Sequence, residues 1–440
     1  MNRRVFLKTG LATTSFLLLP HITPCEEKGV ATRDSLCGEA DERIEKYRKG
    51  AGRINVRDSM GKPLKRVKIT VEQLGHDFLF GCNFFMFGHC GDPEAEEQYR
   101  QKFADVFNYC TLGFYWAAYE RERGKPNYSY TDQVVEWTRA HGIQSKGHPL
   151  VWDHPAGSPA WLPENPEEIQ RLSAARVKEI VSRFNGRIDI WDVVNEATHL
   201  PDKVNKTKMA KWALEFGAVR YVTDHLKVAR AASPEATLLV NDYRTDPPYL
   251  RLLKDVRKET GVAFDAVGIQ SHMHDGSWDT SGTWQICETY ARLGLPLHFT
   301  ETTLVSGPRT GPGENWGATE ADLETKQAEG TENFYKLLFS HPSVQGITWW
   351  DFSDRGAWQR AAAGWLRKDM SAKPVYERMK SLIKSHWWTK AQGVTNAEGN
   401  YPLNAFFGTH RLSLELPNGR QATHEVHWQR GGHNEINLVM

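Results

Sequence analysis

Hydrophobic and polar positions alternate along residues 51–75 in the pattern of two β-strands. A turn at Asp58–Gly61 separates the two strands, and Val67, Ile69 and Val71 occupy every second position of the second one. A period of two places these side chains on one face of a strand, and this face is expected to be buried. We therefore predict a small sheet before the main body of the chain.

Residues 76–388 change to a different pattern, in which a short apolar strand, a loop and a helix repeat eight times. The clearest helix has Asn165 as N-cap and Pro166 at its first position, and it ends at Gly186. Eight such repeats predict an α/β fold, the TIM (β/α)8 barrel. A doubly wound open sheet would also alternate, but no glycine-rich phosphate loop follows any strand. The predicted strands are Phe78–Asn83, Tyr109–Phe114, Ile143–Trp152, Asp189–Glu196, Thr237–Tyr243, Asp265–His272, Leu297–Thr302 and Gln345–Phe352.

Residues 389–440 return to a strand pattern. Asn418-Gly419 is a strong hairpin turn signal between candidate strands at Arg411–Leu416 and Gln421–Trp428. A segment of this length is too short for a comfortable core of its own. We expect it to pack with residues 51–75 into a small accessory β-sandwich formed from the N- and C-terminal segments.

The first 28 residues have the composition of an export signal. Arg3-Arg4 precede Phe6-Leu7-Lys8, and an apolar run from Leu11 to Pro20 follows. This order resembles a bacterial twin-arginine signal, so we expect export to the periplasm or the medium. The apolar run is too short to span a bilayer, and no membrane span is expected in the mature protein.

Composition narrows the possible partners. The 440 residues carry a formal net charge of +1, which gives no support for nucleic acid or an acidic membrane as the main partner. The six cysteines form no Cys-x-x-Cys pair, so neither a metal site nor a cofactor is expected. They are expected to be mostly buried thiols, and a Cys82–Cys90 disulfide is the alternative for that pair. The 16 Trp suit either a core or a sugar-binding cleft, because a pyranose stacks on an indole. We expect a monomer.

Polar side chains recur where the predicted strands end, which is where a TIM barrel places its catalytic groups. Glycoside cleavage needs two carboxyl groups that face each other across the bond, about 5–5.5 Å apart for retention of configuration. Glu196 and Glu301 end strands four and seven, which lie across the barrel mouth. The alternative is that both are ordinary surface glutamates.

The chain resembles glycoside hydrolase family 10, the xylanases, over roughly residues 100–380. The resemblance implies a TIM barrel and a retaining hydrolase without cofactor, and it rests on six segments in strand order. These are Gly147–Trp152, Trp191–Glu196, Val240–Tyr243, Gly268–His272, Thr300-Glu301 and Gly346–Trp350.

The same resemblance implies roles for single residues. Glu196 would be the acid/base and Glu301 the nucleophile. Asn195 would bond the sugar 2-hydroxyl, His148 would bind the sugar in subsite −1, and His272 would hold the nucleophile's carboxylate and keep it ionised. The other residues expected in substrate binding are Trp152, Tyr243, Gln270, Trp350 and Trp358.

The sugar-reading positions depart from the family. The family's Glu-Asn-x-x-Lys-Trp after strand two corresponds to Thr111–Trp116, which retains only the Trp. Its Trp-His after strand three is Trp152-Asp153, and the Asp two residues after the nucleophile is Thr303. Three consecutive aromatic residues, Phe114, Tyr115 and Trp116, are expected to offer apolar surface to the substrate instead. We therefore predict weak activity on linear xylan.

A loop at Ser306–Gly317 is expected to lie over the barrel mouth and contact substrate, although it could be a disordered insertion. The leading function is hydrolysis of a β-linked polysaccharide, xylan or a related decorated β-glycan. A second enzyme hypothesis is a β-glycosidase for a non-xylan plant or algal glycan. A third is a non-catalytic carbohydrate-binding barrel, which has no need of both glutamates. A metal-dependent hydrolase would need more ligands than His272 and His274.

Overall fold

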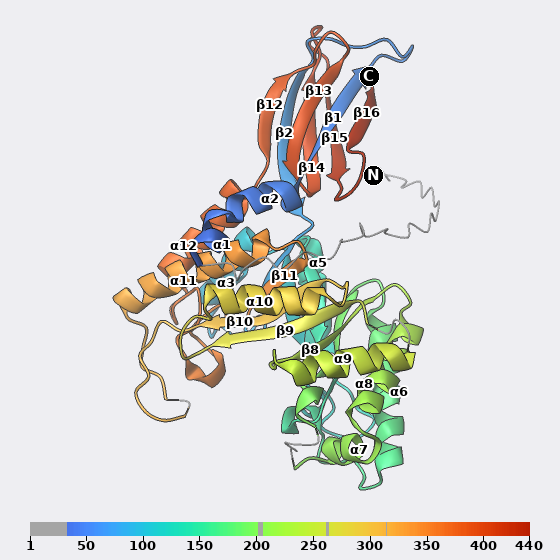
Figure 1. The fold of residues 1–440 in the computed structure, drawn as a ribbon, viewed down its shortest axis with the longest axis vertical. Coiled ribbons are helices and arrows are strands. Elements are labelled where there is room, and N and C mark those ends of the chain that lie inside the picture. The colour runs from blue at the N-terminus through green and yellow to red at the C-terminus, as the bar shows by residue number, and fades with distance from the viewer. Residues whose placement is uncertain (1–32, 201–205, 261–263, 314) are drawn as a thin grey trace.

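The computed structural model describes residues 33–200, 206–260, 264–313 and 315–440 (Figure 1). The predicted export signal, residues 1–28, lies outside these ranges. Within them, no helix is both long and apolar enough to cross a bilayer.

The main body is a closed barrel of eight parallel strands, which confirms the predicted TIM fold. Pairing of β5 with β7 closes the sheet, and β6 continues the barrel strand that β5 begins. Pro149 separates β5 from β6, because proline lacks the N–H that a ladder requires. The strands are β3 Leu79–Asn83, β4 Tyr109–Gly113, β5 Gln144–His148, β6 Val151–Trp152, β7 Ile190–Asn195, β8 Thr237–Asp242, β9 Ala266–Met273, β10 Leu297–Leu304 and β11 Val344–Trp349.

Helices cover the outside of the barrel. Asn165 caps α6 as predicted, since its Oδ1 accepts a hydrogen bond from the backbone N–H of Glu168 at 2.8 Å. The same helix buries Ile169, Val177 and Phe184 against the barrel. The helices are α3 Pro93–Val106, α4 Trp116–Tyr119, α5 Ser129–Ala140, α6 Pro166–Phe184, α7 Lys208–Phe216, α8 Ala218–Ala232, α9 Pro247–Thr260, α10 Thr280–Ala291, α11 Ala321–Ser340 and α12 Pro374–Ser381.

The two ends of the chain form the accessory β-sandwich that the sequence predicts. Figure 1 shows the blue N-terminal strands beside the red C-terminal ones. One sheet has the order β13-β1-β16 and the other β12-β2-β14-β15, and their buried side chains share one core. The strands are β1 Lys49–Arg57, β2 Lys68–His76, β12 Lys390–Val394, β13 Asn400–Phe406, β14 Gly408–Glu415, β15 Gln421–Trp428 and β16 Glu435–Val439.

The predicted hairpin at Asn418-Gly419 joins β14 to β15. The backbone N–H of Gly419 donates to the carbonyl of Leu416 at 2.9 Å. Gly419 has φ of +84°, a left-handed conformation that glycine adopts without strain. The turn therefore fixes the register of these two strands.

Two short helices, α1 Arg33–Gly38 and α2 Ala40–Arg48, precede the sandwich. At the end of α2, the buried guanidinium of Arg48 donates to the backbone carbonyls of Phe339, His341 and Val344. Val344 begins β11, so this contact lies at the amino-terminal end of the barrel strands. The sandwich is thus anchored at the barrel end opposite the strand carboxyl termini.

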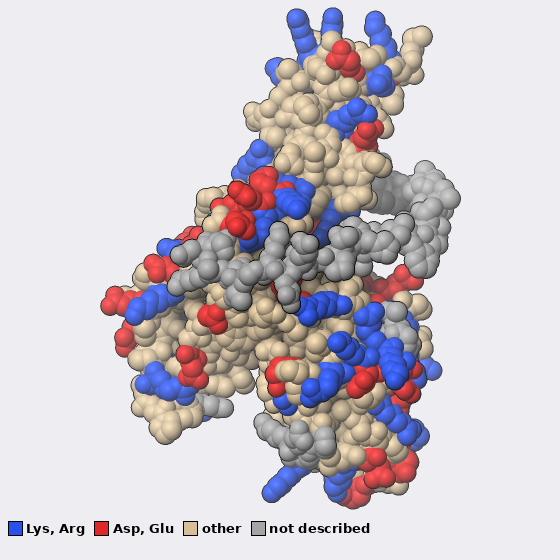
Figure 2. All heavy atoms as spheres, viewed as in Figure 1, with Lys and Arg blue, Asp and Glu red and all other residues tan. Residues whose placement is uncertain are grey.

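Charges are mixed over the surface. On the face shown in Figure 2, Lys and Arg alternate with Asp and Glu rather than forming one large patch of a single sign. Cysteines Cys37, Cys82, Cys90, Cys110 and Cys287 have free thiols, so the Cys82–Cys90 disulfide is absent.

Candidate active site

Glu196 and Glu301 lie at the carboxyl-terminal end of the barrel, and one chain of amides connects them. Glu196 directly follows β7, while Glu301 lies within β10. The Nδ2 of Asn241 donates to Oε1 of Glu301 at 2.7 Å and to Oδ1 of Asn195 at 2.8 Å. The Nδ2 of Asn195 in turn donates to Oε1 of Glu196 at 3.1 Å. Two carboxyl groups from distant segments therefore share one site.

Glu196 is held in a demanding backbone conformation. Its φ of 58° and ψ of 36° are left-handed, which is uncommon for a residue other than glycine. Its backbone N–H donates to the carbonyl of Asn241 at 2.8 Å. The Nε2 of Gln270 donates to its Oε1 at 3.0 Å, and the Nε1 of Trp152 donates to its Oε2 at 3.1 Å. Strain that the surroundings enforce in this way is characteristic of functional positions.

Burial sets the protonation of Glu196. Removal from water raises the pKa of its carboxyl to about 7, and the negative charges of Glu301 and Asp242 act in the same direction. The hydrogen bonds from Gln270 and Trp152 oppose this rise without cancelling it. Near neutral pH, a substantial share of Glu196 therefore carries a proton that it can give away.

Glu301 is more deeply buried, with 5% of its surface exposed, yet it behaves in the opposite way. Burial alone would raise its pKa, but the charges of His148, His272 and Lys146 lower it below the ordinary value. The Nε2 of His272 lies 3.1 Å from Oε2 of Glu301, and the Nε2 of His148 lies 3.8 Å from its Oε1. Glu301 is accordingly held as a carboxylate.

His148 is fixed by groups that lie behind it. Its Nδ1 lies 2.8 Å from Oδ2 of Asp192. The same oxygen forms an ion pair with Nζ of Lys146 at 2.6 Å. Lys146 and Asp192 are fully buried. The ion pair lowers the pKa of Asp192 despite burial. The Asp192 carboxylate thus stays in contact with Nδ1 of His148, and Nε2 of the same ring faces Glu301.

His272 is positioned by a hydroxyl group. The Nδ1 of His272 lies 2.8 Å from Oγ1 of Thr303, the residue that replaces the family's aspartate. A hydroxyl can donate or accept, so it orients the ring without adding a charge. The departure noted in the sequence therefore changes the charge beside His272 and leaves its contact with Glu301.

Aromatic rings form the walls beside the two carboxyl groups. Trp350 is buried, and its ring meets those of His148 and His272 edge-on at 5.4 and 5.8 Å. Trp358 is 44% exposed, and its ring centroid lies 4.5 Å from that of His272. An exposed indole beside His272 is suited to stacking against a sugar ring.

Tyr243 is much more exposed than Glu301. It follows β8 and is 42% exposed. Burial and the nearby charges of Asp242 and Glu196 raise the pKa of its hydroxyl. Its position suits contact with substrate outside the reacting centre.

The expectation for the aromatic segment after β4 is wrong in part. Phe114 is fully buried, with its ring 5.1 Å from that of Trp191, and Trp116 is buried beside Trp161. Only Tyr115 faces the site, with its ring 5.9 Å from that of His148. Alternate residues of this segment point to opposite sides, so two of the three rings serve the core.

Several residues of the site escaped the sequence-based assignment. Asn241 was part of a recognised segment but received no role, although it bridges the two halves of the site. Lys146 and Asp192 also lie within or beside recognised segments. Asp351 is a further buried acid, whose Oδ1 accepts the backbone N–H of Trp358 at 3.1 Å. Burial raises the pKa of Asp351 to about 7.

A metal centre finds no support in the described ranges. No group of three or more His, Cys, Asp or Glu side chains among them is arranged to hold a metal ion. The chemistry that this geometry offers is proton donation by one carboxyl group beside a second one that stays ionised.

Comparison with known proteins places the chain in a family. A model described as Glycosyl hydrolase family 10 matches residues 79–382. The chain is 27% identical over 400 residues to anti-sigma-I factor RsgI6 of Acetivibrio thermocellus, over 89% of this chain and 48% of that protein. It is 29% identical over 292 residues to endo-1,4-beta-xylanase B of Thermotoga neapolitana, over 64% of this chain and 78% of that protein.

Among solved structures, xylanase 10B from Thermotoga petrophila RKU-1 in complex with xylobiose superposes with a TM-score of 0.60 at 24% identity. The match covers 70% of this chain and 95% of that one. The family model spans more than half of the residues, so the chain belongs to glycosyl hydrolase family 10. The predicted family and fold are thereby confirmed. The chain spans about half the length of several curated relatives that it matches.

Proposed function

We propose that this protein is a retaining glycoside hydrolase that cleaves a β-linked polysaccharide, xylan or a related decorated β-glycan. The observation that carries the proposal is the opposite protonation of two linked carboxyl groups. Burial raises the pKa of Glu196 to about 7, while His148 and His272 lower that of Glu301. Such a separation supports Glu196 as the acid and Glu301 as the nucleophile.

In the first step, the Glu301 carboxylate attacks the anomeric carbon, and the bond from that carbon to the glycosidic oxygen breaks. Glu196 gives its proton to the departing oxygen. A covalent glycosyl ester on Glu301 remains. Asn195 would bond the sugar 2-hydroxyl, and the position of its amide between Asn241 and Glu196 supports this role.

In the second step, Glu196 is a carboxylate and removes a proton from a water molecule. The resulting hydroxide attacks the same carbon, and the ester bond to Glu301 breaks. Glu196 is protonated again, and Glu301 is again ionised. Two inversions at one carbon give a product with the β-configuration of the substrate.

The substrate class follows from the family and the walls of the site. The curated relative from Thermotoga neapolitana is named an endo-1,4-beta-xylanase, and this name supports a xylan-like backbone. Trp358 and Tyr115 supply ring surface for a sugar, and His148 and Gln270 supply polar contacts. The twin-arginine-like pattern at residues 3–8 supports export, where such a polymer would be met.

Substitution of the nucleophile tests this function. Glu301→Gln should abolish turnover of a β-linked polysaccharide, because an amide cannot form the glycosyl ester. Reducing-sugar release is measured beside a circular dichroism spectrum that reports the fold. Glu398→Gln, an exposed glutamate of the sandwich, is the matched control and should keep full activity. Full activity of the Glu301→Gln variant would end the proposal.

A further inference from the structure

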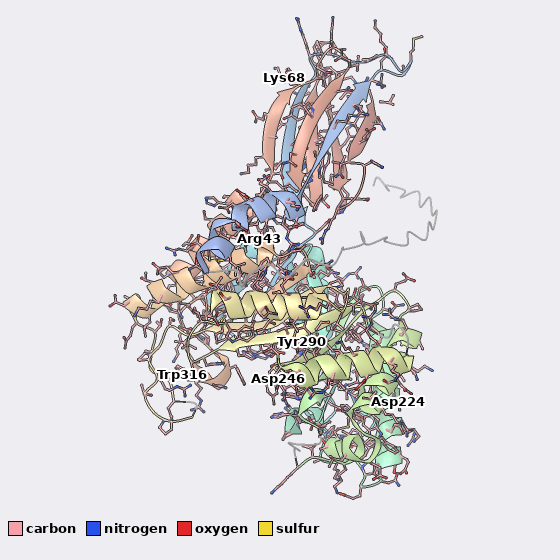
Figure 3. All side chains as sticks on the ribbon, in the orientation of Figure 1. Arg43, Lys68, Asp224, Asp246, Tyr290 and Trp316 are labelled. Carbon is pink, nitrogen blue, oxygen red and sulfur yellow. The ribbon has the colours of Figure 1, made fainter. Side chains whose placement is uncertain are left out.

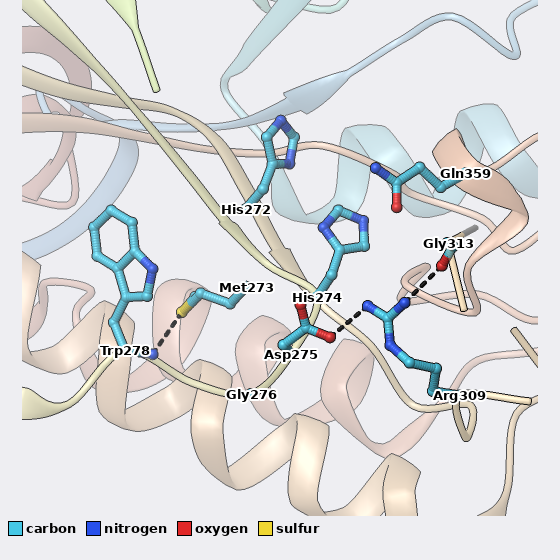
Figure 4. Close-up of a pocket in the computed structure, with 9 residues that line it drawn as sticks. All are labelled: His272, Met273, His274, Asp275, Gly276, Trp278, Arg309, Gly313 and Gln359. Carbon is cyan, nitrogen blue, oxygen red and sulfur yellow. Dashed lines mark hydrogen bonds and ion pairs between the residues drawn. The ribbon is translucent and has the colours of Figure 1, made fainter. Parts of the chain in front are cut away.

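A cavity of about 540 Å³ is lined by His272 and by residues that follow it in the chain (Figure 4). This volume is within the range of about 300–1,000 Å³ that is typical of small-molecule sites. Its walls come from β9 and the segment that follows it, from the loop after β10, and from the turn after Trp358. The lining residues that matter below are His272, His274, Asp275, Arg309 and Gln359.

The cavity shares one residue, His272, with the catalytic centre. His272 lines it and also contacts the Glu301 carboxylate through Nε2 at 3.1 Å. The ring of Trp358 lies 4.5 Å from that of His272 and 5.1 Å from that of His274, so the exposed indole contacts two residues of the cavity wall. Because the same imidazole serves both, the cavity adjoins the place where a substrate would meet Glu301.

Charges in the cavity cancel. Arg309 forms an ion pair with Asp275, and its Nη1 donates to the carbonyl of Gly313 at 2.6 Å. Its guanidinium also lies 4.3 Å from the ring centre of Trp316, which Figure 3 places on the loop after β10. Burial lowers the pKa of His274 to about 4, so its ring is neutral near pH 7. A negatively charged guest would meet Asp275, while both Arg309 and His272 already face a carboxylate.

One buried polar atom of the described cavity lining lacks a partner. Among the residues that the structure describes, Nε2 of His274 is buried without a hydrogen bond. Leaving such a nitrogen unpaired is costly, so a site of this kind favours a guest that supplies the missing bond. The amide of Gln359 faces the same space in Figure 4 and can donate and accept.

From these contacts we infer that the cavity binds a neutral sugar branch carried by the polysaccharide next to the scissile bond. The inference rests on the proposed glycoside hydrolase function and specifies its substrate. Adjacent hydroxyl groups of a sugar match a neighbouring acceptor and donor such as Asp275 and Arg309. A branch that carries a carboxylate is disfavoured, because Arg309 is already paired with Asp275.

The test measures binding and turnover separately. Three xylo-oligosaccharides of equal length are compared: unbranched, with one arabinofuranosyl branch, and with one glucuronosyl branch. Their Kd values are determined by calorimetry in the Glu301→Gln background, where turnover is disabled. The arabinofuranosyl form should bind more tightly than the unbranched form, and the glucuronosyl form should not.

Two substitutions locate that preference. Arg309→Met should reduce the ratio of branched to unbranched affinity by about tenfold, as expected for the loss of one or two hydrogen bonds. Asp275→Asn frees Arg309 and should improve binding of the glucuronosyl form at least severalfold. Arg53→Met is the matched control, because Arg53 forms an exposed ion pair with Glu435 in the sandwich, and the ratio should not change.

The outcomes separate the cavity from the catalysis. Equal affinity for branched and unbranched forms, or an unchanged ratio in Arg309→Met, would overturn the inference. Tighter binding of the glucuronosyl form by the unsubstituted cavity would replace the neutral branch by an acidic one and overturn it as well. Branch-dependent binding by a wild-type chain that turns over neither the three oligosaccharides nor any β-linked polysaccharide would instead refute the proposed hydrolase and leave the cavity assignment standing.

Discussion

Glu196 and Glu301 have the same side chain, and only their surroundings distinguish them. Glu196 accepts hydrogen bonds from neutral amides and an indole, which stabilise its charge less than burial destabilises it. Glu301 has His148 and His272 at its two oxygens, and their charges outweigh its burial. The site therefore separates two pKa values by the charge of the nearest partners.

This separation predicts a bell-shaped dependence of kcat/KM on pH. The proposed mechanism needs protonated Glu196, so activity should fall as pH rises through about 7. It also needs ionised Glu301, so activity should fall again only below the ordinary glutamate value of 4.5. Initial rates at low substrate concentration between pH 3 and 9 would show both limbs. A flat profile up to pH 9 would contradict the role of Glu196.

The leaving group provides a second prediction for Glu196. Glu196→Ala removes the proton donor, so cleavage of the polysaccharide should slow by about 10²–10⁴-fold. An aryl β-glycoside with an acidic phenol needs little protonation, and its first step should be much less affected. The comparison requires kcat/KM for both substrates in the variant and the wild type. An equal loss on both would exclude the acid role.

The residue scale also shows where sequence reasoning stops. The ends of the apolar runs identified Glu196, Glu301, His148 and His272, because a parallel barrel gathers those ends at one mouth. Asn241 lies in one of the same runs, but its role depends on which amide atom faces which neighbour. That information arises from packing between β7, β8 and β10 and is not present in a single strand.

At the scale of elements, most strands were predictable from their apolar runs and the turns that bound them. The predicted strand Ile143–Trp152 is divided in the structure, because Pro149 cannot donate to the ladder. The chain continues after it as β6, where Trp152 reaches Glu196. The proline was visible in the sequence, but its effect on the position of Trp152 was not.

The segment after β4 illustrates a harder case. Three consecutive aromatic residues give no indication of which ring faces solvent, since the preceding strand ends at Gly113. In the structure Phe114 and Trp116 join the core, and Tyr115 faces the site. The polar residues that the family uses here are replaced by buried Thr111 and Leu112.

This segment sets the prediction for substrate. Each lost hydrogen bond to a sugar hydroxyl costs on the order of 0.5–1.5 kcal/mol of binding free energy. The loss of several such bonds should therefore weaken the binding of linear xylan by roughly tenfold or more. Reducing-sugar release should be low on unsubstituted linear xylan and higher on a substituted xylan or another β-glycan. Linear xylan as the best substrate of such a panel would refute this account of the site, while the catalytic pair would stand.

At the scale of the whole molecule, the middle of the chain forms the barrel, and its two ends together form the β-sandwich. The barrel presents the carboxyl groups at the carboxyl ends of its strands, and Arg48 fixes the sandwich at the other end. Period-two patterns at both ends, each too short for its own core, made their association predictable. The contact of Arg48 with three carbonyls was not, because it depends on where α2 meets β11.

The central claim is that Glu301 forms a covalent glycosyl intermediate, and the configuration of the first product tests it most directly. The reaction is followed by proton NMR on a timescale faster than mutarotation. Double displacement at Glu301 predicts that the β-anomer of the new reducing end appears first and the α-anomer follows by mutarotation. Appearance of the α-anomer first would mean single displacement by water and would contradict the account.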